Sequence, residues 1–156
     1  LGTRIHAGYD FNVNYGFDSP VGLWDVGVVA NKQTEFEEEV VPGTGSFSRI
    51  GTRQAPGWQT RYQIQWEADS IPLRASLVSN YKSGYEDGTQ TLDDHLLHNF
   101  TISYEFADLL DGVTLQGRVR NLLDEQPPYY ANAEGYDEDN HTPYGRQFEL
   151  TLRAKF

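Results

Sequence analysis

Residues 143–156 read PYGRQFELTLRAKF. From Phe148 onward every second residue is apolar, and the residues between them are polar or charged. A β-strand projects successive side chains to opposite faces, so this segment has one apolar face and one charged face. We therefore expect a strand that separates an apolar medium from water, and that finishes on the aromatic residue Phe156 in the sequence given.

The same alternation recurs in six earlier segments, which span residues 3–17, 24–30, 58–67, 73–82, 99–106 and 113–119. Alternation over such lengths is typical of strands with two different faces. Three short turns separate some of them, at residues 18–20, 69–72 and 108–112. Three long polar segments separate the others, at about residues 34–57, 84–97 and 124–142. The order short, long, short, long predicts an all-β fold, an antiparallel meander of about seven strands with its long loops at one end.

Composition leaves few function classes open. The chain has 156 residues, no cysteine and no methionine, so it carries neither a disulfide framework nor a thiolate metal site. No segment approaches the run of about 18 apolar residues that a membrane helix needs. The sequence begins at Leu1 rather than at a methionine, so we expect a processed chain or a piece of a longer one.

Negative charge is concentrated in the long loops. The formal net charge is −11, and the windows 35–57, 83–97 and 123–143 hold 14 of the 23 acidic residues. An acidic surface of this kind disfavours nucleic acid as a partner. The plainer interpretation, that these loops are simply solvated, stays open.

Aromatic residues indicate which medium the apolar faces meet. They crowd these faces and collect near both ends of the expected strands, as with Trp58 at the long-loop end and Trp24 and Trp66 at the short-turn end. Two belts of aromatic rings are typical of the two interfaces of a lipid bilayer. The opposite faces carry charged residues such as Arg61, which suit a wet lumen. We expect a transmembrane barrel with its apolar face toward lipid.

The C-terminal third combines several motifs in a fixed order. An alternating strand from Val113 is followed by NLLDEQPP (121–128), a loop rich in Gly, Tyr and Asp, then Gly145 and Arg146, then the final alternating strand. This arrangement resembles the C-terminus of TonB-dependent outer-membrane receptors. The resemblance covers residues 112–156 well, and extends more loosely to the stretches PGWQTRYQIQW (56–66) and LVSNYKSGYED (77–87).

The resemblance assigns two sets of residues. The family signature corresponds to Asn121, Leu122, Asp124, Gly145 and Arg146, and the barrel-assembly signal corresponds to Phe148, Leu150, Leu152 and Phe156. From the residues alone, the signature is structural: Asn and Asp side chains close a turn, and Gly145 makes room where the loop rejoins the sheet. The cation Arg146 is expected to pair with a carboxylate.

The same resemblance implies an architecture, a location and a function. Such receptors are barrels of about 22 strands around a plugged lumen, so this chain would be the C-terminal segment of a 22-stranded transmembrane β-barrel. The N-terminal plug and the earlier strands would belong to the rest of a longer protein. Its location would be the bacterial outer membrane. The whole protein would import a scarce nutrient such as a ferric siderophore, haem or cobalamin. The implied partners are outer-membrane lipid, the rest of the barrel and its plug, TonB acting through the plug, and the barrel-assembly machinery.

Aromatic residues in the long loops are the best candidates for binding such a nutrient, because flat apolar rings can grip an organic chelate. These candidates are Phe47, Tyr85, Tyr129, Tyr130 and Tyr136. The acidity of the loops argues against a strongly anionic ligand.

Two motifs suggest metal binding, but neither is convincing. In DDHLLH (93–98), His95 and His98 would point to opposite faces of a strand. GYDEDN (135–140) lacks the distal glutamate of a calcium-binding loop. No catalytic constellation or phosphate-binding loop is evident, so we expect no metal, no cofactor and no enzymatic activity.

Two other classes of protein stay open on the sequence. One is a small soluble β-barrel or sandwich that binds an apolar ligand inside, with its aromatic faces buried together. The other is a passive porin-like barrel with no plug.

Overall fold

The computed structural model describes residues 2–106 and 112–154, and in these ranges every regular element is a β-strand. The strands are β1 (Thr3–Ser19), β2 (Gly22–Glu39), β3 (Phe47–Ser48), β4 (Trp58–Glu67), β5 (Leu73–Lys82), β6 (Tyr85–Asp87), β7 (Gln90–Leu92), β8 (His95–Phe106), β9 (Val113–Arg120) and β10 (Gln147–Ala154). The prediction of an all-β chain is confirmed. Within the described ranges no helix is long and apolar enough to cross a membrane.

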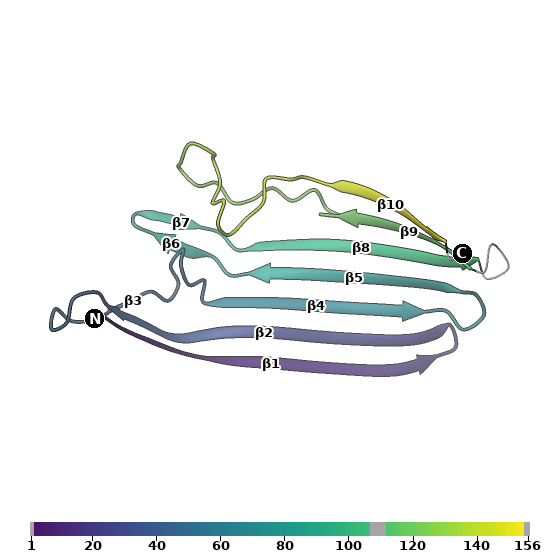
Figure 1. Ribbon diagram of the computed structural model, residues 1–156, viewed down its shortest axis with the longest axis horizontal. Helices are drawn as coiled ribbons and strands as arrows, with labels where there is room; N and C mark the ends of the chain where they lie inside the picture. Colours follow the sequence, from purple (N-terminus) through teal and green to yellow (C-terminus); the bar gives the residue numbers. More distant parts are fainter. Residues whose placement is uncertain (1, 107–111, 155–156) are drawn as a thin grey trace.

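Seven strands form one antiparallel sheet in the order β1-β2-β4-β5-β8-β9-β10, which is their order along the chain (Figure 1). The short strand β3 adds to the outer end of β2, and β6 pairs with β7 in a separate hairpin. The expected seven-stranded meander is therefore confirmed. Figure 1 also places β3, the β6–β7 hairpin and the loop between β9 and β10 at one end of the sheet, and the connections β1–β2 and β4–β5 at the other. We call these the loop end and the turn end.

The strand register joins all the apolar faces into one surface. One row across the sheet pairs Trp24 with Trp66, Trp66 with Ala75, Ala75 with Ile102, Ile102 with Gly117, and Gly117 with Leu150. Because side chains alternate along each strand, every second row lies on this same face. The intervening rows carry residues such as Asp25, Gln65, Ser76, Thr101, Gln116 and Thr151. One sheet thus has a continuous apolar face and a continuous polar face.

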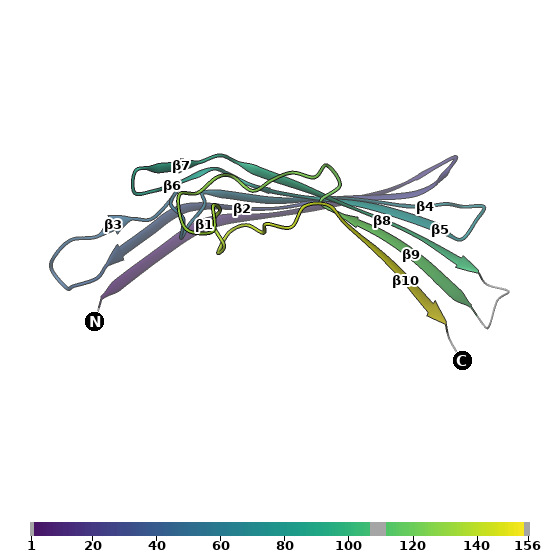
Figure 2. The same cartoon turned by 90° about the horizontal axis from the view of Figure 1, so that it is seen from above.

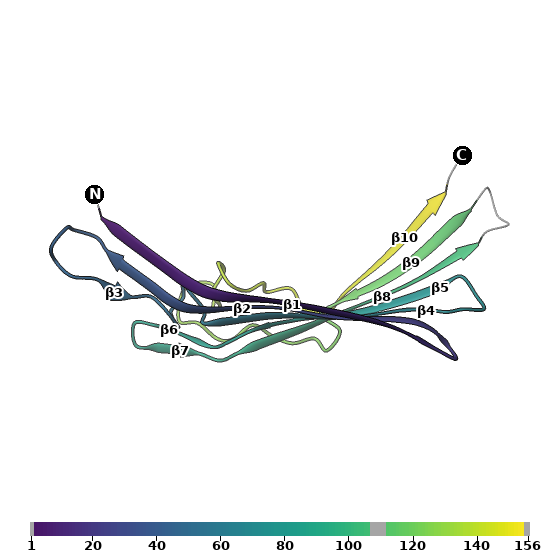
Figure 3. The ribbon, with the colours of Figure 1, turned by 90° about the horizontal axis from the view of Figure 1, so that it is seen from below.

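Neither face is covered by a second layer in the described ranges. Seen from above and from below, the sheet is a single twisted and curved layer (Figures 2 and 3). Phe148 and Leu150 on the apolar face are each 76% exposed. The only cluster of buried apolar residues found in the described part consists of Tyr85, Leu92 and Tyr130, which lie at the loop end rather than between sheets.

Both edges of the sheet are open. In the described part of the chain β1 pairs only with β2, and β10 pairs only with β9. Each edge therefore presents a row of backbone groups without strand partners, as a piece of a larger sheet would.

The prediction that strand two ends near Ala30 was wrong. β2 continues to Glu39, and its residues 35–39 pair with residues 3–7 of β1. The run EFEEE has low strand propensity, which is why it resembled a loop. Cross-strand contacts stabilise it: the rings of Phe36 and His6 contact each other in a tilted arrangement with centroids 3.9 Å apart, and Glu38 accepts hydrogen bonds from Arg49.

A β-bulge marks the outer limit of the apolar face. The register shifts between Ala7 and Gly8, so that Thr34 has no partner in β1. Beyond it, Ala7 is opposite Glu35 and Ile5 is opposite Glu37, so carboxylates replace the apolar partners. The β1–β2 hairpin therefore extends past the apolar band as a charged projection.

The expected loop at 84–97 also contains regular structure. Residues Gly88 and Thr89 make the two-residue turn of the β6–β7 hairpin, because Asp87 pairs with Gln90. Gly88 has φ 60°, as the first central residue of a type II′ turn requires. β8 begins at His95 rather than at Asn99, because His95 already pairs with Lys82 of β5. The expected turn at 108–112 and the terminal residue Phe156 lie mostly or wholly outside the described residues.

Candidate functional site

Three segments at the loop end are joined around the carboxylate of Asp137, which is fully buried. Arg53 donates to Asp137 Oδ1 at 2.9 Å, and Asn140 donates to its Oδ2 at 2.8 Å. The hydroxyl of Tyr85 also donates to Oδ2. Since these partners come from the β3–β4 connection, β6 and the β9–β10 loop, one buried carboxylate ties the three segments together. We call this group the Asp137 network.

The pKa values of the ionisable groups in the network are shifted by burial and by the hydrogen bonds between these groups. Burial alone raises the pKa of Asp137, but the hydrogen bonds from Tyr85, Asn140 and Arg53 outweigh it and lower the pKa to about 2. The bond to Asp137 raises the pKa of Arg53. Burial, and then the bond to Asp137, raise the pKa of Tyr85. The carboxylate is therefore ionised at neutral pH, while the phenol keeps its proton.

Two histidines extend the network onto the polar face of the sheet. His141 Nε2 lies 3.1 Å from the Tyr85 hydroxyl oxygen, and His141 Nδ1 lies 3.0 Å from His95 Nδ1. Lys82 Nζ donates to two oxygens of Asn140, at 2.7 and 3.0 Å. Burial, and then the charges of His95 and Lys82, lower the pKa of His141 to about 4.

A pocket of about 400 Å³ lies on the polar face beneath this loop. Its apolar wall includes Val29 and Leu97, and its polar lining includes Arg61, Lys82, His95, Asn80, Asn140 and His141. No Asp or Glu lines it among the residues that the structure describes. This pocket, which we call the outer pocket, is thus cationic within a chain whose loops are strongly acidic.

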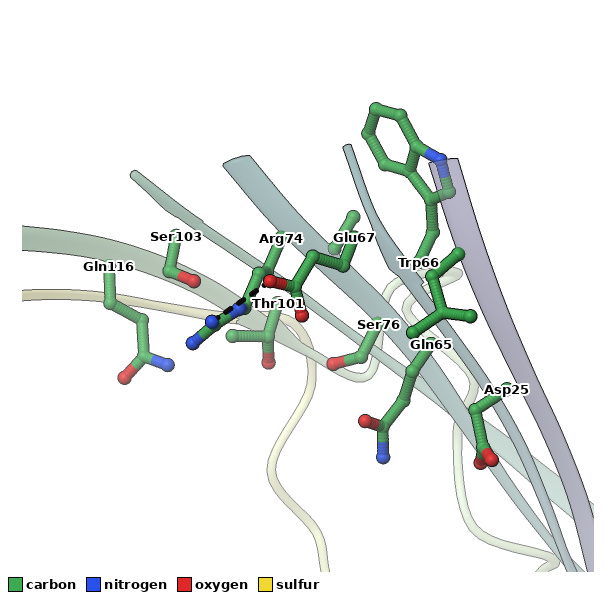
Figure 4. Close-up of a pocket in the computed structure, with 11 residues that line it drawn as sticks. Asp25, Gln65, Trp66, Glu67, Arg74, Ser76, Thr101, Ser103 and Gln116 are labelled. Atoms are coloured by element: carbon green, nitrogen blue, oxygen red, sulfur yellow. Dashed lines mark hydrogen bonds and ion pairs between the residues drawn. The ribbon is translucent and has the colours of Figure 1, made fainter. Parts of the chain in front are cut away.

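A second hollow of about 290 Å³ lies on the same face at the turn end. Figure 4 shows Gln65, Ser76 and Thr101 pointing to one side of the sheet and Trp66 pointing to the other. At the edge of this hollow Arg74 pairs with Glu67 at 3.0 Å (Figure 4). The polar face is therefore hollowed at both ends and offers hydrogen-bonding groups along its length.

The aromatic ligand candidates fall into two groups. Tyr85 and Tyr130 are buried, and their hydroxyls donate to Asp137 and Asp87 respectively. Tyr129 is 76% exposed and is bridged to the half-buried Tyr136. The structure thus brings these four tyrosines to the β9–β10 loop and the β6–β7 hairpin.

Phe47, the fifth aromatic candidate, lies on β3 and is exposed. The guanidinium carbon of Arg49 is 4.2 Å from the centre of its ring. Its place is on the β1–β2 projection, because β3 pairs with β2 rather than with the β6–β7 hairpin.

The signature residues build the junction between β9 and β10. The Asn121 side chain accepts from the Glu125 backbone N–H at 2.8 Å and donates to the Glu125 carbonyl at 2.8 Å. Asp124 Oδ1 accepts from the backbone N–H of Arg146 at 2.7 Å. Both Asn121 and Asp124 have positive φ, at 51° and 60°, which Asn and Asp tolerate better than most residues.

The other signature residues complete this junction. Gly145 is needed for space, because a Cβ there would lie 2.7 Å from Asp124 Oδ1. Leu122 donates its backbone N–H to the His98 carbonyl at 2.7 Å. The side chain of Arg146 forms no ion pair within residues 2–106 and 112–154, so the expected partner is not seen there.

Of the expected assembly residues, Phe148, Leu150 and Leu152 share the apolar face of β10 and are exposed. Phe156 lies outside the described residues.

The two candidate metal motifs are engaged in other contacts. His95 contacts His141, while His98 lies on the opposite face, with its Nδ1 2.7 Å from the Ser79 hydroxyl. The DEDN part of GYDEDN contains Asp137 and Asn140 of the network. Among the described residues no group of three potential ligands is arranged to hold a metal ion.

No family model, no curated protein and no solved structure matches this chain.

Proposed function

We propose that this chain is the C-terminal wall of a TonB-dependent outer-membrane transporter, which imports a scarce nutrient of the ferric siderophore, haem or cobalamin class. In this role it supplies seven adjoining strands of a barrel of about 22, outer loops that contact the nutrient, and the C-terminal strand that the assembly machinery recognises. The remaining strands, the plug and the segment that engages TonB belong to the rest of the protein.

The observation that carries the proposal is the uncovered apolar face. It extends over all seven strands and leaves many large apolar side chains exposed, among them Val28, Tyr62, Ile64, Ile102, Phe148 and Leu150. Soluble monomers rarely expose apolar patches of more than a few hundred Å², whereas lipid accepts such a face. A soluble barrel that binds an apolar ligand would need these side chains in a closed interior, which the described residues do not form.

The dimensions of this face also support a membrane. β4 and β5 each have 10 residues, within the 9 to 11 that a tilted strand needs to cross a bilayer. Trp58 stands at one end of β4 and Trp66 near the other. At the turn end the indole N–H of Trp24 donates to Ser19 Oγ at 3.0 Å, and that of Trp66 donates to the Val21 carbonyl at 3.1 Å. Rings with a satisfied polar edge suit the bilayer interface.

The open edges and the polar face support a large barrel rather than a small one. Unpaired edge groups are costly in lipid, so β1 and β10 require partner strands. The polar face carries hollows at both ends, which a plug and a nutrient could fill. The open edges and the hollows fit a passive porin equally well. The plugged transporter is favoured over a porin by the resemblance of the C-terminal motifs.

Charge placed on either face of β10 tests the proposal. Leu150 and Thr151 are neighbours in β10 but lie on opposite faces. Leu150→Arg puts a cation into lipid, which costs about 2 to 4 kcal/mol near the bilayer midplane, while Thr151→Arg puts it into the lumen. We expect the first variant to assemble poorly into outer membranes and the second to assemble normally, as measured by fractionation of cells expressing the whole protein.

The opposite result would overturn the membrane assignment. If the apolar face met water, Leu150→Arg would leave the yield unchanged or improve it. Equal assembly of both variants would also contradict the proposal.

A further inference from the structure

One buried nitrogen at the outer pocket has no partner. His95 is 7% exposed and lines the pocket, and its Nε2 makes no hydrogen bond within the described part of the chain. A buried polar atom without a partner is unfavourable unless something satisfies it. This atom therefore indicates a group that enters the pocket from outside.

The Asp137 network determines which kind of group that is. The ionised carboxylate of Asp137 can only accept, so the single hydroxyl hydrogen of Tyr85 is directed to it. The Tyr85 oxygen must then accept from His141 Nε2, which places the hydrogen of neutral His141 on that nitrogen.

The position of the hydrogen on His141 determines the tautomer of His95. With its hydrogen on Nε2, His141 has a bare Nδ1, which can only accept. The 3.0 Å contact between the two Nδ1 atoms is then a hydrogen bond donated by His95. Neutral His95 thus carries its hydrogen on Nδ1 and presents a bare Nε2 to the pocket. The group that satisfies it must be a donor.

The remaining lining of the pocket favours an anion. Arg61 makes no ion pair or side-chain hydrogen bond within residues 2–106 and 112–154, and its planar guanidinium matches a carboxylate. Lys82 uses two of its three hydrogens on Asn140 and keeps one. The carboxylates of the acidic loops are absent from the described lining.

We propose that the outer pocket binds a small hydroxycarboxylate, whose hydroxyl donates to His95 Nε2 and whose carboxylate meets Arg61 and Lys82. Val29 and Leu97 accommodate an apolar part of the same molecule. The place of this pocket as a nutrient subsite rests on the proposed function, but the binding itself does not. Tyr85 acts as a positioning residue, because it sets the hydrogens of His141 and His95 and does not line the pocket, whereas His141 also forms part of the lining.

Three related probes separate the contributions. Mandelate has a hydroxyl, a carboxylate and an apolar ring; phenylacetate lacks the hydroxyl, and 1-phenylethane-1,2-diol lacks the carboxylate. We measure their affinities by NMR titration of the intact protein in detergent, with EDTA present to exclude metal ions. Mandelate is expected to bind about tenfold more tightly than either analogue, since each loses a hydrogen-bonding group that the site is built to satisfy. Equal affinities for mandelate and phenylacetate, or no binding of mandelate, would overturn the proposal.

Variants then assign the preference to its residues. His95→Asn keeps an amide near the Nδ1 position but has nothing at Nε2, so mandelate and phenylacetate should become equal. His98→Asn, the same change on the opposite face, should leave the preference unchanged. Arg61→Gln should weaken mandelate and phenylacetate together and leave the diol unaffected. A hydroxyl preference that survives in His95→Asn would contradict the assignment.

The wild-type protein offers a test that needs no variant. Imidazole nitrogen chemical shifts distinguish a bare nitrogen from a protonated one, and we expect His95 to be protonated on Nδ1 and bare on Nε2. In Tyr85→Phe the acceptor for His141 is lost, so the His95 shifts and the hydroxyl preference should change while phenylacetate affinity does not. A protonated Nε2 in the wild type would overturn the proposal. If mandelate does not bind but the protein assembles normally into membranes, the binding proposal fails and the proposed transporter function stands. If mandelate binds but the protein does not enter membranes, the proposed function fails and the binding proposal stands.

Discussion

The guanidinium Nε of Arg53 lies 2.9 Å from Oδ1 of Asp137, although the two residues are 84 positions apart in the chain. Arg53 also reaches the carboxylates of Glu138 and Asp139, at 3.5 and 3.0 Å, and its guanidinium carbon lies 5.2 Å from the centre of the Tyr130 ring. Strand pairing does not determine where the loops at this end lie, because each loop leaves the sheet separately. This ion pair and its neighbours therefore determine how the β9–β10 loop lies over the polar face.

Removing the charge of Asp137 should release this loop. Asp137→Asn leaves Arg53 without its buried partner, and breaking such a pair costs about 3 kcal/mol. Asp139→Asn is the matched control, because Asp139 contacts the same guanidinium but is 74% exposed, so its loss should cost less than about 1 kcal/mol. Amide hydrogen exchange in residues 129–142 measures both, and equal exchange in the two variants would contradict the central place of Asp137.

Acid should loosen the loop in two stages. Burial, and then the charges of His95 and Lys82, lower the pKa of His141 from 6.5 to about 4, while the nearby Asp137 opposes the shift. An opened loop binds this proton more readily than the closed one, so the closed form is favoured fully above pH 6.5 and progressively less down to pH 4. Asp137, with its pKa lowered from 3.8 to about 2, contributes stability that is lost between about pH 4 and pH 2.

Hydrogen exchange of the loop, corrected for the intrinsic effect of pH, follows both stages. His141→Asn should reduce the stage between pH 6.5 and 4 to the part contributed by His95, whose pKa burial also lowers, and should keep the stage below it. Loop stability that is constant from pH 7 to pH 4 in the wild type would contradict the shift assigned to His141.

The junction of β9 and β10 should not tolerate a side chain at Gly145. In Gly145→Ala the new Cβ meets Asp124 Oδ1 and disrupts its bond to the Arg146 N–H, at a cost of about 1 to 2 kcal/mol. Gly57→Ala is the control, since a Cβ there finds its nearest atom at 3.9 Å. Thermal unfolding in detergent measures both changes.

A second substitution tests the reason for that cost. Asp124→Gly removes the clashing carboxylate, and glycine adopts the positive φ of this position without strain. In the double-mutant cycle the cost of Gly145→Ala should then nearly disappear. An unchanged cost would mean that Gly145 is required for another reason.

The sheet could be predicted from the sequence because alternation is a local property. Each of the seven long strands has its own period-two pattern, and a shift of one residue would move all its apolar side chains to the polar face. What the pattern missed was structure without alternation. The outer half of β2 is stabilised by cross-strand pairs such as Arg4 with Glu38, and the β6–β7 hairpin is set by its turn at Gly88 and Thr89.

The candidate site was less accessible to sequence reasoning. The aromatic ring of Tyr85 and its place between strands predict a ligand-binding residue, but its hydroxyl belongs to the Asp137 network. Nothing in the sequence connects Arg53 with Asp137, because their contact depends on how two loops fold back over the sheet. In the sequence His95 suggests only a metal ligand, because its orientation as an acceptor depends on the chain of hydrogen bonds that reaches it through His141.

The three tryptophans test most directly whether the apolar face meets lipid. Trp24, Trp58 and Trp66 are the only tryptophans in the chain, and all lie on that face near its two ends. In the protein reconstituted into bilayers with brominated lipids, these residues should be quenched strongly by bromine near the headgroups and less by bromine near the midplane. Tryptophans in the rest of the longer protein are first replaced. Single Trp→Phe variants then assign the quenching to Trp24, Trp58 or Trp66. Quenching by aqueous iodide but by neither brominated lipid would contradict the account.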